Sequence, residues 1–548
     1  MAHGLPRETD TVIVGNGPSA LILSYILHGN IPCYDSSSPH PDRILHEKLL
    51  LHLQHNQQND LLDVDIDALT THFSASRFSY STQALPINVL LDTLVRPLGE
   101  TDDAQKKTCV TWRYDRSRAV PHVVIGNTKD AGGQWVDNPV HASWDIGTLS
   151  YAGMLSLPGY GFDEHYKRRH GQTMPVYLRP SRREVADYLA AYPDQVGIAK
   201  YIHNGQRIAR VSRRRDYAGF YIASHGMVCR NLVLASGIFD TVIPPPAMLE
   251  PLLSLEGEEI DRPLRPSPSS DAHDPILVIG SGFSAADVII STPPTQKIIH
   301  VFKWDPSTSP SPLRGCHRQA YPEYAGVYRR MKVAALSSSS SSSSSSHSNK
   351  DRRPRTLRSQ SAFEASRDWD LTYEGLSNTE IVRVQLTPDG SGMVTFQREG
   401  VNDPPFQRRV GSLAYVVGRR GSLCYLSEEL RAEFLSADAD CHMISGQTLR
   451  QQANEDLEVA PHVFVTGSLT GDSLIRFAYG GCAYAAGRIM RRHAHNHAES
   501  KRTGTGTTAV NNAFVAKRTN NCRCETPSPK IPAMNGLDGH EASPINLK

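Results

Sequence analysis

Two short glycine turns contain the residues of this sequence whose types and spacing could do chemistry. The first, residues 15–20, reads GNGPSA; it follows an apolar run and opens an apolar segment. Gly15 permits a tight turn and Gly17 lets the backbone approach a pyrophosphate, while Ala20 keeps the helix close to a sheet. Pro18 suits a first helical turn, and the helix N-terminus that continues at Ser19 directs its free N–H groups toward phosphates. The turn therefore predicts a dinucleotide site.

An acid stands where a ribose would need one. Residues 31–34 read as a second strand and end at Asp35, which follows Gly15 by 35 − 15 = 20 residues. At that position a carboxylate accepts hydrogen bonds from a ribose diol. Strand, turn, helix, strand and acid in register favour a βαβ unit that binds a nucleotide. The alternative is a tight turn without a ligand.

The second turn, residues 280–285, reads GSGFSA and lies between an apolar run at 276–279 and a helical pattern. Gly280, Gly282 and Ser284 are its expected contacts with a nucleotide. The following strand, residues 298–302, ends at Lys303, 303 − 280 = 23 residues after the first glycine. A cation in place of the acid favours a 2′-phosphate, and hence NADPH. Asp305, two residues later, leaves open the alternative that the site binds a free 2′-hydroxyl.

Five further candidates lie near strand ends. Gly237 closes a β-rich run, and Gly467 follows a strand at 462–466. Asp472 precedes a long small-residue segment expected to be a helix, where its carboxylate could bind a ribityl or ribose hydroxyl and also cap the helix. Gly133 and Trp135 belong to a GGQW run that would let the backbone pass close to a planar ring. The alternative for GGQW is a turn with a buried tryptophan.

The chain, 548 residues long, exceeds what one core supports. We expect an α/β fold with two Rossmann-like dinucleotide-binding domains, of the FAD/NAD(P)-binding flavin monooxygenase type. The expected division is an FAD-binding domain in two parts, 1–250 and 411–497, with an inserted NADP-binding domain at 251–410. A serine-rich stretch at 337–360 and a tail at 498–548 are expected to be disordered.

Composition excludes several classes. A net charge of +2 gives no reason to expect nucleic acid, and nine scattered cysteines favour a reduced compartment over a disulfide framework. No signal peptide or membrane-spanning run is evident, so an intracellular, cytoplasmic protein that is not integral to a membrane is expected. No metal site is expected, because the histidine and cysteine spacings are weak.

The first unit, which the C-terminal Gly-Asp segment is expected to complete, suits FAD because that cofactor is long enough to need both ends of the chain. The inserted second unit suits NADPH, and the two together suggest hydride transfer from NADPH to flavin. No CxxC follows the first turn, so oxygen is preferred over a disulfide as the acceptor. The expected activity is that of an NADPH-dependent FAD monooxygenase, which activates oxygen as a C4a-(hydro)peroxyflavin and acts on an unidentified small molecule or protein. The alternatives are an oxidase that releases peroxide and a regulatory scaffold that keeps the fold without catalysis.

Four stretches together carry a family resemblance. They are GNGPSA at 15–20, LLDVDIDAL at 61–69, VPHVVIG with GGQW at 120–135, and LTGDSLIRFAYGG at 469–481. The set resembles the oxidative stress-induced growth inhibitor family. The resemblance implies an FAD flavoprotein with monooxygenase activity, a role in growth control, oxidative stress and cytokinesis, and a possible midbody or cytoskeletal association. One departure is that common flavin monooxygenases place GGxW shortly after the ribose acid, whereas almost a hundred residues intervene here.

Overall fold

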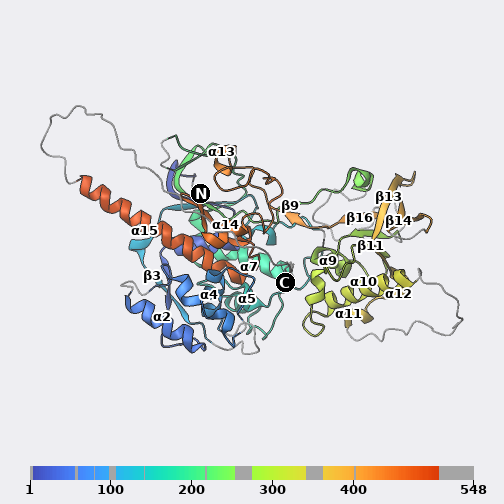
Figure 1. Cartoon of the computed structure of the whole chain (residues 1–548), viewed down its shortest axis with the longest axis horizontal. Helices are drawn as coiled ribbons and strands as arrows, with labels where there is room; N and C mark the ends of the chain where they lie inside the picture. Colours follow the sequence, from blue (N-terminus) through green and yellow to red (C-terminus); the bar gives the residue numbers. More distant parts are fainter. Residues whose placement is uncertain are drawn as a thin grey trace, which may run out of the picture.

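The computed structural model describes residues 4–55, 60–78, 80–97, 107–140, 142–215, 219–253, 274–340, 362–399 and 403–504. Each of the two units contains a sheet in which a central strand, parallel to both of its neighbours, leads into a glycine turn and a helix. In Figure 1 the first unit lies on the left and holds both ends of the described chain, while the second unit lies on the right. The predicted α/β class with two Rossmann-like units is confirmed by this topology.

The first sheet has the strand order β18-β19-β8-β1-β4-β5, with β6 and β7 forming an antiparallel extension of β8. Its central strand is β1 (Glu8–Val14), which is parallel to β4 (His122–Ile125) and to β8 (Met227–Leu234). The outer strands are β5 (Ile202–His203), β6 (Val211–Arg213), β7 (Phe220–Ile222), β18 (Glu458–Ala460) and β19 (Val463–Val465). The C-terminal part of the chain thus completes a sheet that the N-terminal part begins.

The strand expected next to β1 is elsewhere. β2 (Asn30–Tyr34) pairs antiparallel with β3 (Val110–Tyr114) in a separate two-stranded sheet, and β4 pairs with β1 instead. The predicted direct β1–α1–β2 unit was therefore wrong in its second strand. Between β2 and β3 the chain forms the helices α2 (Arg43–His55), α3 (Ile66–Thr70) and α4 (Pro86–Val95). The segment from β2 to β3 is therefore an insertion between α1 and β4, the strand that pairs with β1.

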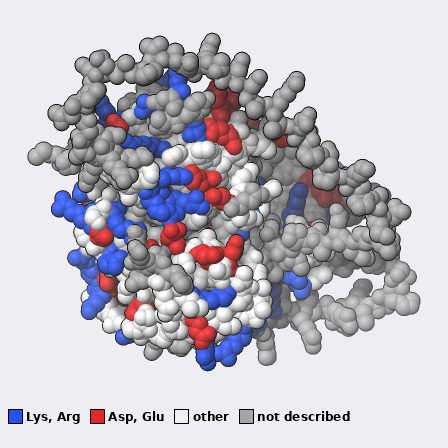
Figure 2. Space-filling view, turned by 60° about the vertical axis from the view of Figure 1, so that its left-hand side comes forward, with Lys and Arg blue, Asp and Glu red and all other residues white. Residues whose placement is uncertain are grey.

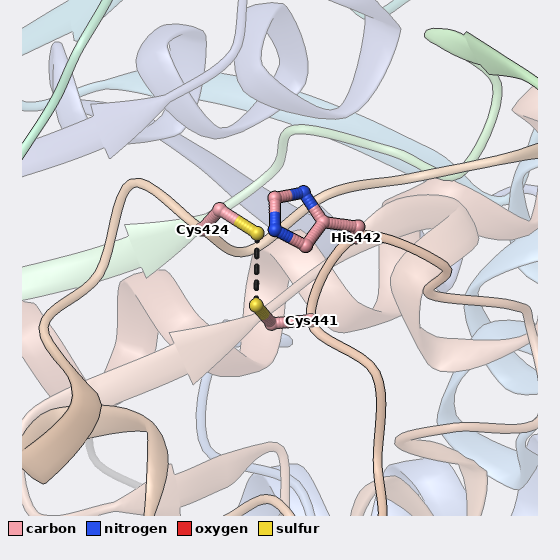
Figure 3. A group of neighbouring side chains, drawn as sticks. All are labelled: Cys424, Cys441 and His442. Carbon is pink, nitrogen blue, oxygen red and sulfur yellow. Dashed lines mark hydrogen bonds between the residues drawn. The ribbon is translucent and has the colours of Figure 1, made fainter.

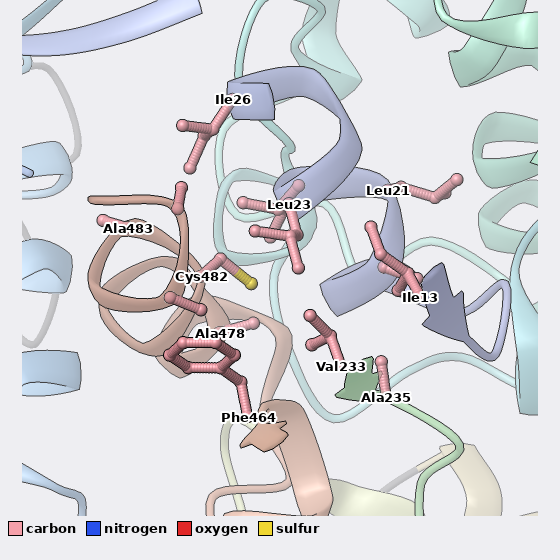
Figure 4. Close-up of a cluster of buried hydrophobic side chains, with 14 of the residues drawn as sticks. Ile13, Leu21, Leu23, Ile26, Val233, Ala235, Phe464, Ala478, Cys482 and Ala483 are labelled. Carbon is pink, nitrogen blue, oxygen red and sulfur yellow. The ribbon is translucent and has the colours of Figure 1, made fainter. Parts of the chain in front are cut away.

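Two helices cover one face of the first sheet. α1 (Pro18–Leu27) packs on α15 (Ala478–Gly504), and Figure 4 shows Leu23 and Ile26 of α1 facing Cys482 and Ala483 of α15. Small residues let α15 approach its neighbours, because a Cβ at Gly480 would lie 2.2 Å from the Ile87 carbonyl oxygen of α4. The small-residue pattern therefore serves close helix packing. The helix begins only at Ala478, after 3₁₀ turns at Gly467–Thr470 and Ile475–Phe477, which is later than predicted.

The second sheet has the order β12-β11-β10-β16, all parallel. β10 (Ile276–Ile279), α9 (Phe283–Ser291) and β11 (Ile298–Phe302) follow the predicted pattern closely. Strand β12 (Tyr373–Ser377) leads into an antiparallel meander of β13 (Thr379–Leu386), β14 (Gly392–Arg398) and β15 (Phe406–Val410). The helix α10 (Pro322–Ser340) covers this sheet and lies close to β12.

The remaining helices and 3₁₀ turns belong to one unit or the other, and the longest of them is α7 (Arg182–Gln195). In the first unit they are Phe73–Ala75, Arg116–Arg118, Gly133–Trp135, α5 (Ala152–Leu155), α6 (Phe162–His170), α7 (Arg182–Gln195), Ala199–Tyr201, α13 (Glu428–Arg431) and α14 (Arg450–Glu455). Those of the second unit are Ala247–Leu249, α8 (Glu250–Leu253), Pro312–Gly315, α11 (Ala362–Ala365) and α12 (Trp369–Thr372).

The units are joined by a small antiparallel ribbon of β9 (Thr241–Val242) and β17 (Arg419–Arg420). β16 (Ser412–Tyr415) pairs with β10, so the predicted return to the first unit at residue 411 was several residues early. Residues before 251 also belong to the second unit, since Leu249 packs in the same core as Leu277. Residues 254–273 lie outside the described residues.

Two predicted disordered stretches are partly helical. Ser337–Ser340 continue α10, and residues 341–361 lie outside the described residues. Similarly, α15 runs to Gly504, through the histidines at 493, 495 and 497, and the described chain ends there. None of the described helices is long and apolar enough to cross a bilayer. Charges of both signs are interspersed on the face in Figure 2.

Candidate functional site

Gly15 and Gly17 differ in whether the surrounding backbone leaves room for a side chain. Gly15 has a φ of +110°, and a Cβ there would lie 2.4 Å from the Ala235 carbonyl oxygen, so the fold itself excludes a side chain. Gly17 has φ −77° and ψ 179°, and a Cβ there would meet nothing closer than 4.0 Å. The chain leaves open space at the second glycine. That space lies at the N-terminus of α1, where free N–H groups favour an anion.

The GGQW turn lies against this glycine turn. A Cβ on Gly133 would lie 3.0 Å from the Gly17 Cα, and Gly132 N donates to Asn16 O at 2.8 Å. Trp135 ends the 3₁₀ turn and is partly buried against the main core. The structure thus brings together two motifs that are more than a hundred residues apart in the chain.

Asn16, inside the first turn, is a functional candidate that the sequence reasoning missed. It is 2% exposed, and its Nδ2 donates to Asp130 O and Asn204 Oδ1 at 3.1 and 2.8 Å. Thr128 Oγ1 donates to Asn16 Oδ1 at 2.8 Å. These bonds tie the loop that follows β4 to the glycine turn. The sequence signal for this contact was the VVIG run at 123–126 with GGQW six residues after it, a spacing typical of a strand and the loop that follows it.

Asp35 follows β2, which does not pair with β1. Its Oδ1 accepts hydrogen bonds from the backbone N and the Oγ of Ser37, at 3.0 and 2.6 Å, and these bonds lower the pKa of the carboxyl group. The strand position predicted for the ribose acid belongs to β4, which ends at Ile125 and is followed by Gly126. A Cβ at Gly126 would lie 2.2 Å from the Asn16 side chain, so no acid fits at that position.

Five other predicted residues lie at or beside the carboxyl ends of β1, β8 and β19. A Cβ on Gly467 would lie 2.3 Å from Ser19 Oγ, and one on Gly237 would lie 3.3 Å from Ser468 Oγ. Pro18 and Ala20 lie in the first turn of α1, and Ala20 is fully buried. The first unit therefore presents one edge formed by its N-terminal and C-terminal halves.

Asp472 is buried and held by protein groups. Its Oδ2 accepts from Leu85 N at 2.8 Å and from Asn88 Nδ2 at 2.6 Å, while its Oδ1 accepts from Arg450 Nη1 at 2.7 Å. The carboxylate thus clamps the C-terminal loop to α4. It does not cap α15, which begins at Ala478.

The second glycine turn repeats the pattern of the first. Gly280 has a φ of +149°, and its Cβ would lie 2.5 Å from the Val416 carbonyl oxygen, whereas a Cβ on Gly282 would meet only Pro312 Cγ at 3.9 Å. His300 of β11 steadies this turn. Because Gly280 O accepts, the His300 Nε2–H donates to it at 2.7 Å, and Nδ1 is left to accept from the Tyr373 hydroxyl at 2.8 Å. Burial lowers the pKa of His300 to about 4, so the ring is neutral at pH 7.

Lys303 is exposed at the end of β11. Asp305 is engaged nearby, since its Oδ1 accepts from the backbone N of Ser307 and Thr308, and hydrogen bonds from these residues lower the pKa of its carboxyl group to about 2. Glu380 and Glu399 line the same cleft as Lys303. The end of β11 thus offers one lysine with two carboxylates in its surroundings.

A cleft of about 1680 Å³ lies between the two units. From the second unit it is lined by the glycine turn, including Gly280, Gly282 and Ser284, and by Lys303. From the first unit it is lined by Gln134 of GGQW and by Ser473, Leu474 and Phe477, which follow Asp472. Arg419 of β17 bridges the units beside it, donating from Nη2 to Gln134 Oε1 at 3.1 Å. The cleft is large enough for a dinucleotide and a second molecule.

The sequence is similar to curated proteins over most of its length. It is 25% identical to an oxidative stress induced growth inhibitor homolog of Caenorhabditis elegans, covering 90% of this chain and 97% of that one. It is 26% identical to oxidative stress-induced growth inhibitor 1 of Mus musculus over 88% and 95% of the two chains. Growth inhibitor 2 of Homo sapiens is 27% identical over 60% and 69%. The resemblance predicted from four motifs is confirmed.

No family model matches the chain. Among solved structures, it is similar to L-lysine 6-monooxygenase from Pseudomonas syringae, with 15% identity over 88% of this chain and 99% of that chain and a TM-score of 0.45. It is also similar to a flavin-containing monooxygenase from Stenotrophomonas maltophilia, with 12% identity, 89% and 100% coverage and a TM-score of 0.42.

Proposed function

We propose that the chain binds FAD at the first glycine turn and NADPH at the second, and acts as an NADPH-dependent flavin monooxygenase. The observation that carries the proposal is the cleft, which both units line and which has the second glycine turn on one wall. A nicotinamide bound from one wall would meet a flavin bound from the other. The names of the relatives add a role in growth inhibition under oxidative stress, which we extend to this chain as part of the proposal.

The residues fit the two cofactors. At each turn the first glycine is required by the protein backbone, and the second stands beside open space. Both second glycines also occupy helix N-cap positions, where glycine is favoured, and a pyrophosphate approaching the free N–H groups there would be a further reason for the absence of a side chain. The argument applies separately to Gly17 and Gly282, and thus supports two nucleotides rather than one.

The residues that would hold FAD are the turn 15–20, the loop after β4, the GGQW turn and the loop of Gly237 and Gly467. Asp35 is replaced in this role by the loop after β4, which Asn16 fixes beside the turn. Asp472 would not touch FAD; its hydrogen bonds would hold in place the loop that continues into the cleft wall at Ser473 and Leu474.

We expect Asp35→Asn to leave the FAD content unchanged. Loss of FAD from that variant would restore Asp35 as a ligand.

Gly282 and Ser284 would hold the pyrophosphate of NADPH, and Lys303 its 2′-phosphate. Bound FAD would supply the redox chemistry, taking a hydride from NADPH and passing electrons to oxygen. The protein would orient the two rings and keep water from the reacting atoms. Leu474 and Phe477 contribute apolar surface to that wall.

The proposal is tested by absorption spectra of the purified full-length protein before and after anaerobic addition of NADPH. We expect an oxidised flavin spectrum that bleaches with NADPH, and slow NADPH consumption in air in the absence of substrate. Peroxide in a one-to-one ratio to NADPH with every substrate tried would indicate an oxidase. Bound flavin that NADPH does not reduce would favour a scaffold without catalysis.

A further inference from the structure

Two thiols and an imidazole meet outside the cleft. Cys424 Sγ and Cys441 Sγ lie 2.8 Å apart, and the ligand atoms of these cysteines and His442 all lie within 4.8 Å of one another. Figure 3 shows the His442 ring beside the Cys424 sulfur and the two sulfurs facing each other. Both cysteines are partly exposed, and His442 is exposed. A small oxidant in solution can therefore reach the group.

The backbone sets the two thiols opposite each other. Leu423 N donates to Cys441 O at 2.8 Å, and Gly421 and Ile444 exchange both of their backbone hydrogen bonds, at 2.8 and 2.9 Å. The loop between the cysteines contains α13, whose Leu430 is buried in the main core. Since both segments are anchored, the thiol contact is part of the fold rather than an encounter of mobile side chains.

The surroundings distinguish the two thiols. Burial and the hydrogen bond with Cys424 raise the pKa of the Cys441 thiol, so this group keeps its proton and can donate it to Cys424. The His442 imidazole beside Cys424 can take up the proton of that thiol. Because the thiolate is the nucleophile, Cys424 is the thiol suited to attack an oxidant.

We propose that Cys424 and Cys441 form a dithiol that hydrogen peroxide or another hydroperoxide oxidises reversibly to a disulfide. The Cys424 thiolate attacks one peroxide oxygen: an S–O bond forms, the O–O bond breaks, and the leaving oxygen takes back the proton that the thiol gave up and departs as water, or as an alcohol when the oxidant is another hydroperoxide. Cys441 then attacks the Cys424 sulfenic acid; the S–S bond forms, the S–O bond breaks, and a second water leaves. The sum is two thiols and one hydrogen peroxide giving one disulfide and two waters. An external dithiol reverses the oxidation by exchange.

A metal site is the competing use of the same residues. Two thiolates on a tetrahedral zinc ion, each about 2.3 Å from the metal, stand roughly 3.7 Å apart. The thiols here are in direct contact at 2.8 Å, which leaves no room for an ion between them without separation of the two anchored segments. The geometry therefore favours the disulfide. Neither cysteine lines the cleft, so this chemistry stands independently of the proposed function.

The test uses purified full-length protein treated with a small excess of hydrogen peroxide, followed by alkylation and peptide mass spectrometry with and without a phosphine reductant. We expect a cross-link between the Cys424 and Cys441 peptides that the reductant removes. Cys33→Ala is the matched control, since Cys33 is also partly exposed, and this variant should form the same cross-link.

The single variants separate the two roles. In Cys441→Ser we expect Cys424 to accumulate as a sulfenic acid, which dimedone traps, and in Cys424→Ser we expect Cys441 to remain a thiol. His442→Gln should slow the oxidation several-fold near neutral pH, because the group that takes up the Cys424 proton is removed. Unchanged thiols at both positions after peroxide would overturn the proposal. So would stoichiometric zinc in the protein as isolated that is lost in Cys424→Ser.

Discussion

At the scale of single residues, the paired glycines separate what the fold needs from what a ligand needs. Gly15 is surrounded by backbone and has a positive φ, whereas Gly17 has ordinary dihedral angles and open space. Gly280 and Gly282 of the second unit show the same contrast, so both glycine turns share this arrangement. Neighbouring glycines of one motif thus predict opposite phenotypes.

We expect Gly17→Val to fold with an unchanged melting temperature in the absence of flavin, and to retain no FAD, because its branched side chain occupies the open space. Gly15→Ala is the matched variant, expected to destabilise the protein by roughly 1–3 kcal/mol or more through its positive φ and the contact with Ala235 O. Flavin absorbance per chain and thermal unfolding of the flavin-free proteins measure both. A folded Gly17→Val protein with full flavin content would refute the proposed FAD site.

Lys303 has a separable role in the choice of coenzyme. Lys303→Ala should weaken NADPH binding by roughly ten- to a hundredfold, the value of a charge-assisted contact of about 1.5–3 kcal/mol, and leave NADH almost unaffected. Titration of the two coenzymes gives the ratio. Arg314→Ala is the control, because the Arg314 side chain is exposed and its Nη1 donates to Pro306 O. Equal losses for both coenzymes would assign the lysine a structural role.

At the scale of elements, β11 and the second glycine turn depend on a neutral histidine. His300 has a folded-state pKa of about 4, below its ordinary value of 6.5, because the ring is fully buried. A depressed histidine pKa contributes stability that is complete above about pH 6.5 and is lost as the pH falls toward about 4. The turn should therefore be a point of acid sensitivity in the second unit.

The variant His300→Gln tests this dependence, since an amide can donate to Gly280 O and accept from Tyr373 without titrating. Between about pH 7 and about pH 4.5 the wild-type protein should lose more unfolding free energy than the variant, by up to about 3 kcal/mol. Denaturant unfolding at several pH values measures the difference. The buried His122 is common to both proteins and cancels. Parallel pH curves for the two proteins would show that His300 does not titrate as described.

At the scale of the whole molecule, the antiparallel ribbon of β9 and β17 connects the two units. Arg419 of this ribbon donates to Gln134 Oε1, Asn138 Oδ1 and Phe239 O, at 3.1 to 3.3 Å. The arginine thus ties the junction between the units to the GGQW turn. The arrangement would fix how the second unit faces the first across the cleft.

We expect Arg419→Ala to slow anaerobic flavin reduction by NADPH by roughly tenfold, because hydrogen bonds from one charged group are lost, while the affinity for each nucleotide changes little. Arg420→Ala is the control, since Arg420 Nη1 bonds only the adjacent Arg419 carbonyl among the hydrogen bonds described for its side chain. Stopped-flow absorbance gives the rate. A loss of nucleotide affinity equal to the loss of rate would place Arg419 in the binding site itself.

The local signals could be read directly from the sequence. Strand, glycine turn and helix at 11–27 and at 276–290 lie where they were predicted, because apolar runs, glycine and proline act over a few neighbouring residues. Lys303 at the end of β11 followed from the same short-range pattern. The family resemblance followed from motifs of similar length.

Only the tertiary structure decided which distant segments became neighbours. Residues 31–34 form a strand as predicted, but this strand pairs with β3 and not with β1. The place beside β1 is occupied by β4, so Asp35 does not lie at the end of a strand that neighbours β1. Gly133 meets Gly17, and Cys424 meets Cys441, across loops whose closure depends on packing of the whole first unit. Strand pairing and thiol contacts join residues far apart in the chain, and no short-range preference specifies the partner.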